Sequence, residues 1–162
     1  GYQPEALLNY LSLLGWNPRT EEEVMSLDEI IQKFDLTMVH KKGAVFDEKK
    51  LNWISGQHLV RQSNESILSG IEMIHKDWRI DFDKAFKLSV IKLMKIRSKS
   101  LMDLMTQTDY FFSDPHEFDE KDVRKTWKND TPDIVSNIQI ILMEIDQWDG
   151  ESLEKILKSL NT

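Results

Sequence analysis

Six basic side chains follow one another in the middle third of the sequence, with no acidic residue among them. They are Lys84, Lys87, Lys92, Lys95, Arg97 and Lys99. Their spacing predicts that four of them, Lys84, Lys87, Lys95 and Lys99, lie near one side of a helix. Such a face can bind the phosphates of a nucleic acid, and the planar fork of Arg97 can also pair two acceptors on a base edge. The same pattern is typical of a solvated helix whose cations favour its C-terminus, so both interpretations stay open.

The sequence contains no recognisable pattern of metal ligands, catalytic nucleophiles or phosphate-binding residues. The four histidines, His40, His58, His75 and His116, lack the spacing of metal ligands on a helix. Cysteine is absent, which excludes thiol nucleophiles and Cys-ligated metals. The sequence contains no glycine-rich phosphate loop, and the acidic run 109–122 lacks the turn glycine and terminal glutamate of a calcium loop. We therefore predict no catalytic residue and no metal site.

The composition is that of a folded protein with an uneven charge distribution. The 162 residues are 40% hydrophobic and carry a net charge of −7, which argues against a nucleic-acid partner only if the charge is spread evenly. Residues 63–105 are net positive, whereas residues 106–162 are strongly acidic.

No apolar run approaches the length of a membrane span, and no secretion signal is present, so we expect a cytoplasmic protein. The opening Gly1-Tyr2 without Met suggests a piece of a longer chain.

Apolar periodicity and capping residues predict an all-α fold of eight or nine helices without a strand. The predicted helices span about 4–15, 26–34, 47–62, 64–74, 81–99, 101–112, 119–128, 131–145 and 150–160. Ser26 and Glu29 form a capping box, whereas Asn64, Asp81 and Thr131 are the expected N-caps of their helices.

Two sets of apolar residues are expected in the core. Leu7, Leu8, Leu11 and Leu14 recur at helical spacing and predict a short buried helix. The five tryptophans each lie at an apolar position of a predicted helical pattern, which favours core anchoring over stacking on bases; they are Trp16, Trp53, Trp78, Trp127 and Trp148.

Several segments resemble the bacterial-type glutamyl-tRNA synthetases. Residues 1–16, GYQPEALLNYLSLLGW, resemble the stretch G-Y-x-P-E-A-L-x-N-Y-L-A-L-L-G-W of that family. Residues 53–59, WISGQHL, match a later element, with Ser55 where the family usually has Asn. Residues 97–101, RSKSL, resemble the element R-x-K-T-L, and Trp148 opens a stretch similar to W-x-x-x-x-L-E. The resemblance covers nearly the whole chain.

This resemblance implies a fragment of a class I aminoacyl-tRNA synthetase. Residues 1–62 would be the end of the stem-contact domain, residues 63–115 the first helical anticodon-binding subdomain, and residues 116–162 the start of a second one that is cut short. The H-I-G-H and K-M-S-K-S-type elements of the catalytic domain are not in this sequence. The fragment would therefore be catalytically silent and hold no cofactor, while the parent enzyme would use ATP and magnesium to join glutamate to its tRNA through glutamyl-adenylate.

The resemblance also implies partners and roles for the cations. The expected partners are tRNA(Glu), with tRNA(Gln) as a second candidate, and the chain's own N-terminal catalytic domain, in a monomeric enzyme without membrane contact. Arg97 would read an anticodon base and Lys84, Lys87, Lys92, Lys95 and Lys99 would attract phosphates. Lys41 and Lys42 would reach the tRNA stem. The alternative is a helical protein–protein interaction module in which the basic stripe 84–99 meets an acidic partner.

Overall fold

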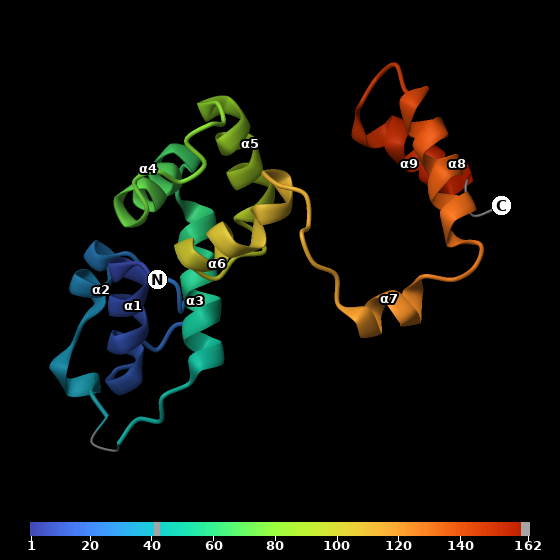
Figure 1. Ribbon diagram of the computed structural model, residues 1–162. Helices are drawn as coiled ribbons and strands as arrows, with labels where there is room; N and C mark the ends of the chain where they lie inside the picture. The colour runs from blue at the N-terminus through green and yellow to red at the C-terminus, as the bar shows by residue number, and fades with distance from the viewer. Residues whose placement is uncertain (41–42, 160–162) are drawn as a thin grey trace. The chain divides into compact units, whose positions relative to one another are not determined.

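The computed structural model describes residues 1–40 and 43–159, and that part of the chain is helical (Figure 1). It contains nine α-helices and two 3₁₀ turns, with one isolated antiparallel bridge between Trp16 and Val39 in place of any strand. The elements are α1 (Pro4–Gly15), α2 (Leu27–Lys33), η1 (Leu36–Met38), α3 (Glu48–Arg61), α4 (Asn64–Ile74), α5 (Lys84–Met94), α6 (Leu101–Gln107), η2 (Asp109–Phe111), α7 (Glu120–Thr126), α8 (Thr131–Met143) and α9 (Gly150–Ser159). The predicted all-α class is confirmed.

The chain divides into an N-terminal unit, Gly1–Asp114, and a C-terminal unit, Pro115–Thr162. The division falls at Asp114-Pro115, where the proline disfavours helical backbone at the preceding residue. The three-part division at residues 62/63 and 115/116 stays a prediction.

Helix α3 contributes to two separate cores of the N-terminal unit. Its first half packs Leu51 and Ile54 against Tyr10 of α1. Its last turn supplies Leu59 to a larger core formed with α4, α5 and α6. Figure 1 shows α3 running from the α1–α2 pair to the α4–α6 group. Because one continuous helix enters both cores, it determines how they are oriented toward each other.

A buried polar network ties α1 to α3 and to the segment before α2. The Asn9 side chain is fully buried, and its Oδ1 accepts from the backbone N–H of Met25 at 2.9 Å. Its Nδ2 donates to the carbonyl of Glu23 at 3.0 Å. The same Oδ1 lies 2.9 Å from Nε2 of His58, which must carry the proton because the amide oxygen can only accept. The guanidinium of Arg61 extends the network by donating to the carbonyl of Val24 at 2.9 Å.

The capping box is confirmed, but three predicted N-caps are wrong. Ser26 accepts from the N–H of Glu29, whose carboxylate accepts from the N–H of Ser26. Helix α4 is capped by Ser63, which accepts from Ser66 N–H, because Asn64 already has helical backbone. The carboxylate that caps α5 is Asp83 and not Asp81, since residues 76–82 form turns before the helix begins. The Thr131 hydroxyl accepts from Lys128 N–H and so closes the turn ahead of α8, while Asp130 occupies the cap position.

The predicted burial is wrong for three of the four leucines of the stripe and for three tryptophans. Helix α1 buries Ala6, Asn9 and Tyr10, and of the stripe only Leu14 packs against the core, whereas the leucines at positions 7, 8 and 11 are exposed. The reason is that α1 turns its small and polar face to α3 in order to form the Asn9 network. Trp16 and Trp78 are buried as predicted, although neither lies within a helix. The other three, Trp53, Trp127 and Trp148, are exposed.

The C-terminal unit has no buried side chain among those that the structure describes. Helix α8 instead lines a mostly apolar groove of about 530 Å³ with Val135, Ile138, Leu142 and Met143, and Trp148 also lines it. No helix among the described residues is long and apolar enough to cross a membrane.

The Asn9 network predicts a large cost for Asn9→Leu. This variant keeps the volume but strands Met25 N–H, Glu23 C=O and His58 N–H, and each buried group without a partner costs roughly 1–3 kcal/mol. We expect urea unfolding to report a loss of about 2–4 kcal/mol. Asn129→Leu, at an exposed position, is the control and should change stability little. Equal effects of the two substitutions would contradict the role of the network.

His58 makes the stability of the N-terminal unit depend on pH. Burial holds the pKa of His58 below its ordinary value of 6.5, and the nearby Arg61 cation lowers it further, while Glu5 opposes this. The unfolded chain therefore binds more protons once the pH falls below 6.5. The contribution is fully present above 6.5 and is lost as the pH falls through the folded-state pKa.

We expect the unfolding free energy to fall between about pH 7.5 and about pH 5.5. His58→Gln, which keeps a donor for Asn9, should flatten this dependence, whereas His116→Gln on the exposed linker should leave it intact. Urea titrations at a series of pH values measure both. An unchanged pH dependence in His58→Gln would show that another group is responsible.

Candidate nucleic-acid interface

The six cations do not share one helix. Helix α5 ends at Met94, so Lys95, Arg97 and Lys99 lie in the turn that connects α5 to α6. The predicted helix through residue 99, with four lysines near one of its sides, is therefore wrong. The chain leaves the helical path because Ser98 and Leu101 are buried and Ser100 caps α6 by accepting from Asp103 N–H.

Two of the six cations are engaged inside the protein. Lys87 is 8% exposed, and its ammonium lies 3.6 Å from a carboxylate oxygen of Glu72 on α4. The ammonium of Lys95 donates to the backbone carbonyl of Gln62 at 2.8 Å. These contacts join α5 and the following turn to neighbouring helices, so both lysines have structural partners.

The other four cations are available to a ligand. The side chains of Lys84, Lys92, Arg97 and Lys99 are exposed, and within residues 1–40 and 43–159 they form no hydrogen bond or ion pair. Lys84 and Lys92 lie on α5, and Arg97 and Lys99 lie on the turn after it. Lys41 and Lys42, predicted to approach an RNA stem, lie outside the described residues.

The turn that carries Arg97 is held by its own backbone. Arg97 N–H donates to Met94 C=O at 3.0 Å, and the hydroxyl of buried Ser98 donates to the same carbonyl at 3.0 Å. At the C-terminal end of the turn, Lys99 N–H donates to the carboxylate of Asp103 at 2.8 Å. The exposed guanidinium of Arg97 thus extends from an ordered turn, which suits directed hydrogen bonding to a base edge.

An exposed aromatic ring near this turn was not identified from the sequence. The ring of Tyr110 is 60% exposed, and its hydroxyl lies 3.5 Å from the sulfur of Met94, the last residue of α5. Exposed aromatic rings can stack on unpaired bases. The sequence signal was the aromatic run that Tyr110 shares with Phe111 and Phe112, of which only Phe112 is buried.

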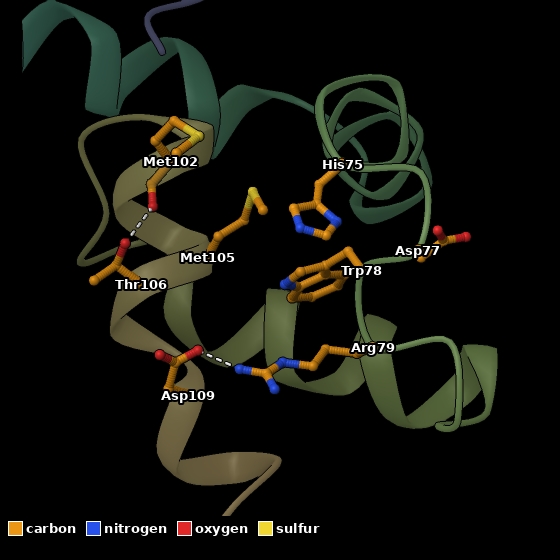
Figure 2. Close-up of a pocket in the computed structure, with 8 residues that line it drawn as sticks. All are labelled: His75, Asp77, Trp78, Arg79, Met102, Met105, Thr106 and Asp109. Carbon is orange, nitrogen blue, oxygen red and sulfur yellow. Dashed lines mark hydrogen bonds and ion pairs between the residues drawn. The ribbon is translucent and has the colours of Figure 1, made fainter.

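A second concave feature lies between the α4–α5 connection and α6 (Figure 2). This pocket of about 370 Å³ has the rings of His75 and Trp78 on one side and Met102 and Met105 on the other. The Arg79 guanidinium pairs with the Asp109 carboxylate and lies over the ring of Phe112, 5.0 Å from its centroid. The backbone of Arg79 has a positive φ of 49°, and among the described non-glycine residues only Arg19, with a φ of 56°, shares this left-handed conformation.

The ion pair of Arg79 with Asp109 therefore holds the α4–α5 connection against η2. The indole of Trp78 adds an edge-to-face contact with Phe112, at 5.4 Å between centroids. In the part of the chain that the structure describes, no group of three or more His, Cys, Asp or Glu side chains is placed to hold a metal ion.

Two family models together match almost the whole chain. The model of an anticodon-binding domain matches residues 59–162. The model of the catalytic domain of class I tRNA synthetases for E and Q matches residues 1–53.

Individual relatives agree with these matches. The chain is 37% identical to a glutamate–tRNA ligase of Phocaeicola vulgatus over 97% of its own length and 31% of that protein. It is 35% identical to that of Flavobacterium psychrophilum over its full length and 32% of the relative. It thus spans about a third of these relatives.

Solved structures show the same similarity. A glutamate tRNA ligase from Elizabethkingia meningosepticum, in complex with its amino acid, matches 99% of this chain with a TM-score of 0.82 and 33% identity. A glutamate-tRNA synthetase from Elizabethkingia anophelis matches 98% with a TM-score of 0.74 and 32% identity. Each match covers 32% of the solved chain. The resemblance found in the sequence is thereby confirmed, since these relatives are glutamate–tRNA ligases, and the chain belongs to the anticodon-binding domain family.

Proposed function

We propose that this chain binds the anticodon arm of a tRNA and that Arg97 reads one of its bases. The observation that carries the proposal is the exposed guanidinium of Arg97, which has no partner within the described residues and stands on an ordered turn. Unstacked loop bases present edges that such a fork can pair, whereas the edges of duplex RNA are hidden. Membership of the anticodon-binding domain family supports this assignment.

The exposed lysines supply the attraction that does not depend on sequence. Lys84, Lys92 and Lys99 would contact phosphates, and Lys41 and Lys42 would contact the tRNA stem. Lys87 and Lys95 contribute to the positive potential, but their ammonium groups already have protein partners. Tyr110 is placed to stack on a neighbouring base.

The parent protein would be a glutamate–tRNA ligase. It would attach glutamate to tRNA(Glu), and tRNA(Gln) is the second candidate, in an ATP- and magnesium-dependent reaction through glutamyl-adenylate. In this proposal residues 1–62 end the stem-contact domain, and residues 63–115 and 116–162 belong to two anticodon-binding subdomains. The chemistry would belong to the catalytic domain of a monomeric, cytoplasmic enzyme, and this portion would position the tRNA.

The alternative of a protein–protein module loses support from the geometry. It requires a continuous basic stripe over residues 84–99. Lys87 is paired with Glu72 and Lys95 with Gln62, so the stripe is interrupted at two of its five lysines.

Arg97→Ala should remove base selectivity. For a glutamate tRNA transcript and the same transcript with an altered anticodon, we expect the difference in binding free energy to shrink by about 1–3 kcal/mol. The slope of log K against log salt should stay nearly unchanged, because phosphate contacts remain. Filter binding at several salt concentrations measures both quantities.

Arg124→Ala is the matched control, since Arg124 is an exposed arginine of the C-terminal unit. It should leave the difference between the two transcripts intact. Equal binding of both transcripts by the unaltered chain, or no effect of Arg97→Ala, would refute base reading. Equal affinity for an acidic peptide and for the transcripts would favour the protein–protein module.

Lys92→Ala should weaken RNA binding, whereas Lys87→Ala should mainly lower the stability of the protein. Loss of one phosphate contact at Lys92 should weaken both transcripts alike and make the salt slope shallower by about 0.7. Lys87→Ala should instead lower the unfolding free energy, because it removes a buried cation next to Glu72, with a smaller change in the slope. Binding and urea unfolding of both variants make the comparison, and identical behaviour would contradict the division of the lysines.

A further inference from the structure

The turn that carries Arg97 is fastened to helix α3 at two points, neither of which involves Arg97 itself. The first is the hydrogen bond from Lys95 Nζ to the carbonyl of Gln62, at 2.8 Å. Gln62 is the residue that ends α3. The last carbonyls of a helix lack intrahelical donors and form the negative end of its dipole, so a cation is well placed there. Lys95 therefore acts as a clamp between the end of α3 and the start of the turn.

The second point is a close approach of two backbones at Gly56. A Cβ atom at this position of α3 would lie 3.3 Å from the carbonyl oxygen of Ser98 and 4.0 Å from the Cα of Lys99. Such a contact is tight, so the absence of a side chain lets the turn settle on the helix. Ser98 is 3% exposed as a result of this packing.

Arg97 lies between these two contacts in the sequence. Its side chain is exposed and meets no partner in the described chain, so the backbone of residues 95–98 decides where the guanidinium is directed. Holding that backbone still reduces the conformational freedom that remains to be lost when the guanidinium binds a base.

We propose that Lys95 and Gly56 are positioning residues for Arg97, which preorganise its guanidinium toward one base of the bound RNA. This role rests on the proposed base-reading function. In it, Lys95 stabilises the turn that carries Arg97 and does not contact a phosphate.

The first test is Lys95→Met in the chain of residues 1–162. The ratio of affinities for the glutamate transcript and its anticodon variant should fall about two- to tenfold, the range that ordering one long side chain covers. The salt slope should stay unchanged, unlike in Lys92→Ala. Lys95→Arg should restore the ratio, since a guanidinium can also donate to the Gln62 carbonyl. A shallower salt slope with an unchanged ratio would make Lys95 a phosphate contact and overturn the proposal.

The double variant Lys95→Met with Arg97→Ala separates positioning from general damage. If Lys95 acts through Arg97, the double variant should show the same ratio as Arg97→Ala alone. A further drop in the ratio would mean that Lys95 acts independently, which overturns positioning. If Arg97→Ala itself leaves the ratio unchanged, base reading and positioning both fall, whereas an effect of Arg97→Ala without one of Lys95→Met removes only positioning.

Gly56→Ala tests the second contact, and Gly15→Ala is its matched control. Both substitutions place the better helix former in a helix, but a Cβ at Gly15 would meet nothing within 4 Å. Gly56→Ala should lower the ratio of affinities for the glutamate transcript and its anticodon variant, while its melting temperature stays close to that of the unaltered chain. Gly15→Ala should leave this ratio unchanged. The same ratio in both variants, measured well below the melting temperature, would contradict a positioning role for Gly56.

Discussion

The N-terminal unit depends on one constraint, which is that helix α3 belongs to two cores at once. Its Leu51 and Ile54 pack with Tyr10, and its Leu59 packs with α4, α5 and α6. Burial of apolar surface has no preferred direction, so either core alone would leave the other half of the unit free to rotate. The Asn9 and His58 hydrogen bond supplies the directional contact that fixes α1 on α3. The turn that carries Arg97 is then fastened to the same helix, through Gly56 and through the carbonyl of Gln62.

The cations near Arg97 show how one residue type serves two purposes. Lysines 87 and 95 end on a carboxylate and on a helix-terminal carbonyl, where their charge stabilises contacts between helices. The exposed ones keep their full hydration and remain able to exchange water for phosphate oxygens. In the proposed function Arg97 differs from both groups, because pairing a base edge depends on the direction of its donors, and that direction requires an ordered backbone. The positive charge near Arg97 therefore includes two lysines that join helices and others that are free, within the described residues, to meet the proposed RNA.

Much of the fold could be predicted from the sequence, because helix periodicity and proline breaks are local signals. Helix α1 and the capping box at Ser26 follow from such signals, and so does the break at Asp114-Pro115. The choice of Ser63 over Asn64 or of Asp83 over Asp81 could not be predicted, since neighbouring residues cap equally well and the path of the preceding loop decides. The face of α1 was wrong for a related reason: its leucines have the period of a core, but the buried Asn9 determines which side meets α3. Likewise, nothing in the spacing of Lys87 and Lys95 tells that their partners are Glu72 and Gln62, which lie far away along the chain.

Because helix α3 packs in both cores, a change in its length would alter how the two cores are oriented. Each residue of an α-helix turns its successor by about 100° and advances it by about 1.5 Å. An insertion of one residue between Ile54 and Leu59 would therefore swing the α4–α6 group around the helix axis and carry the turn bearing Arg97 with it. A substitution among the four residues between Ile54 and Leu59 changes only the contacts of that side chain, whereas a change in their number shifts the helical phase of everything that follows. Length variation among members of the family should accordingly be confined to the connections, such as the segments on either side of α2, where the helical phase is not transmitted.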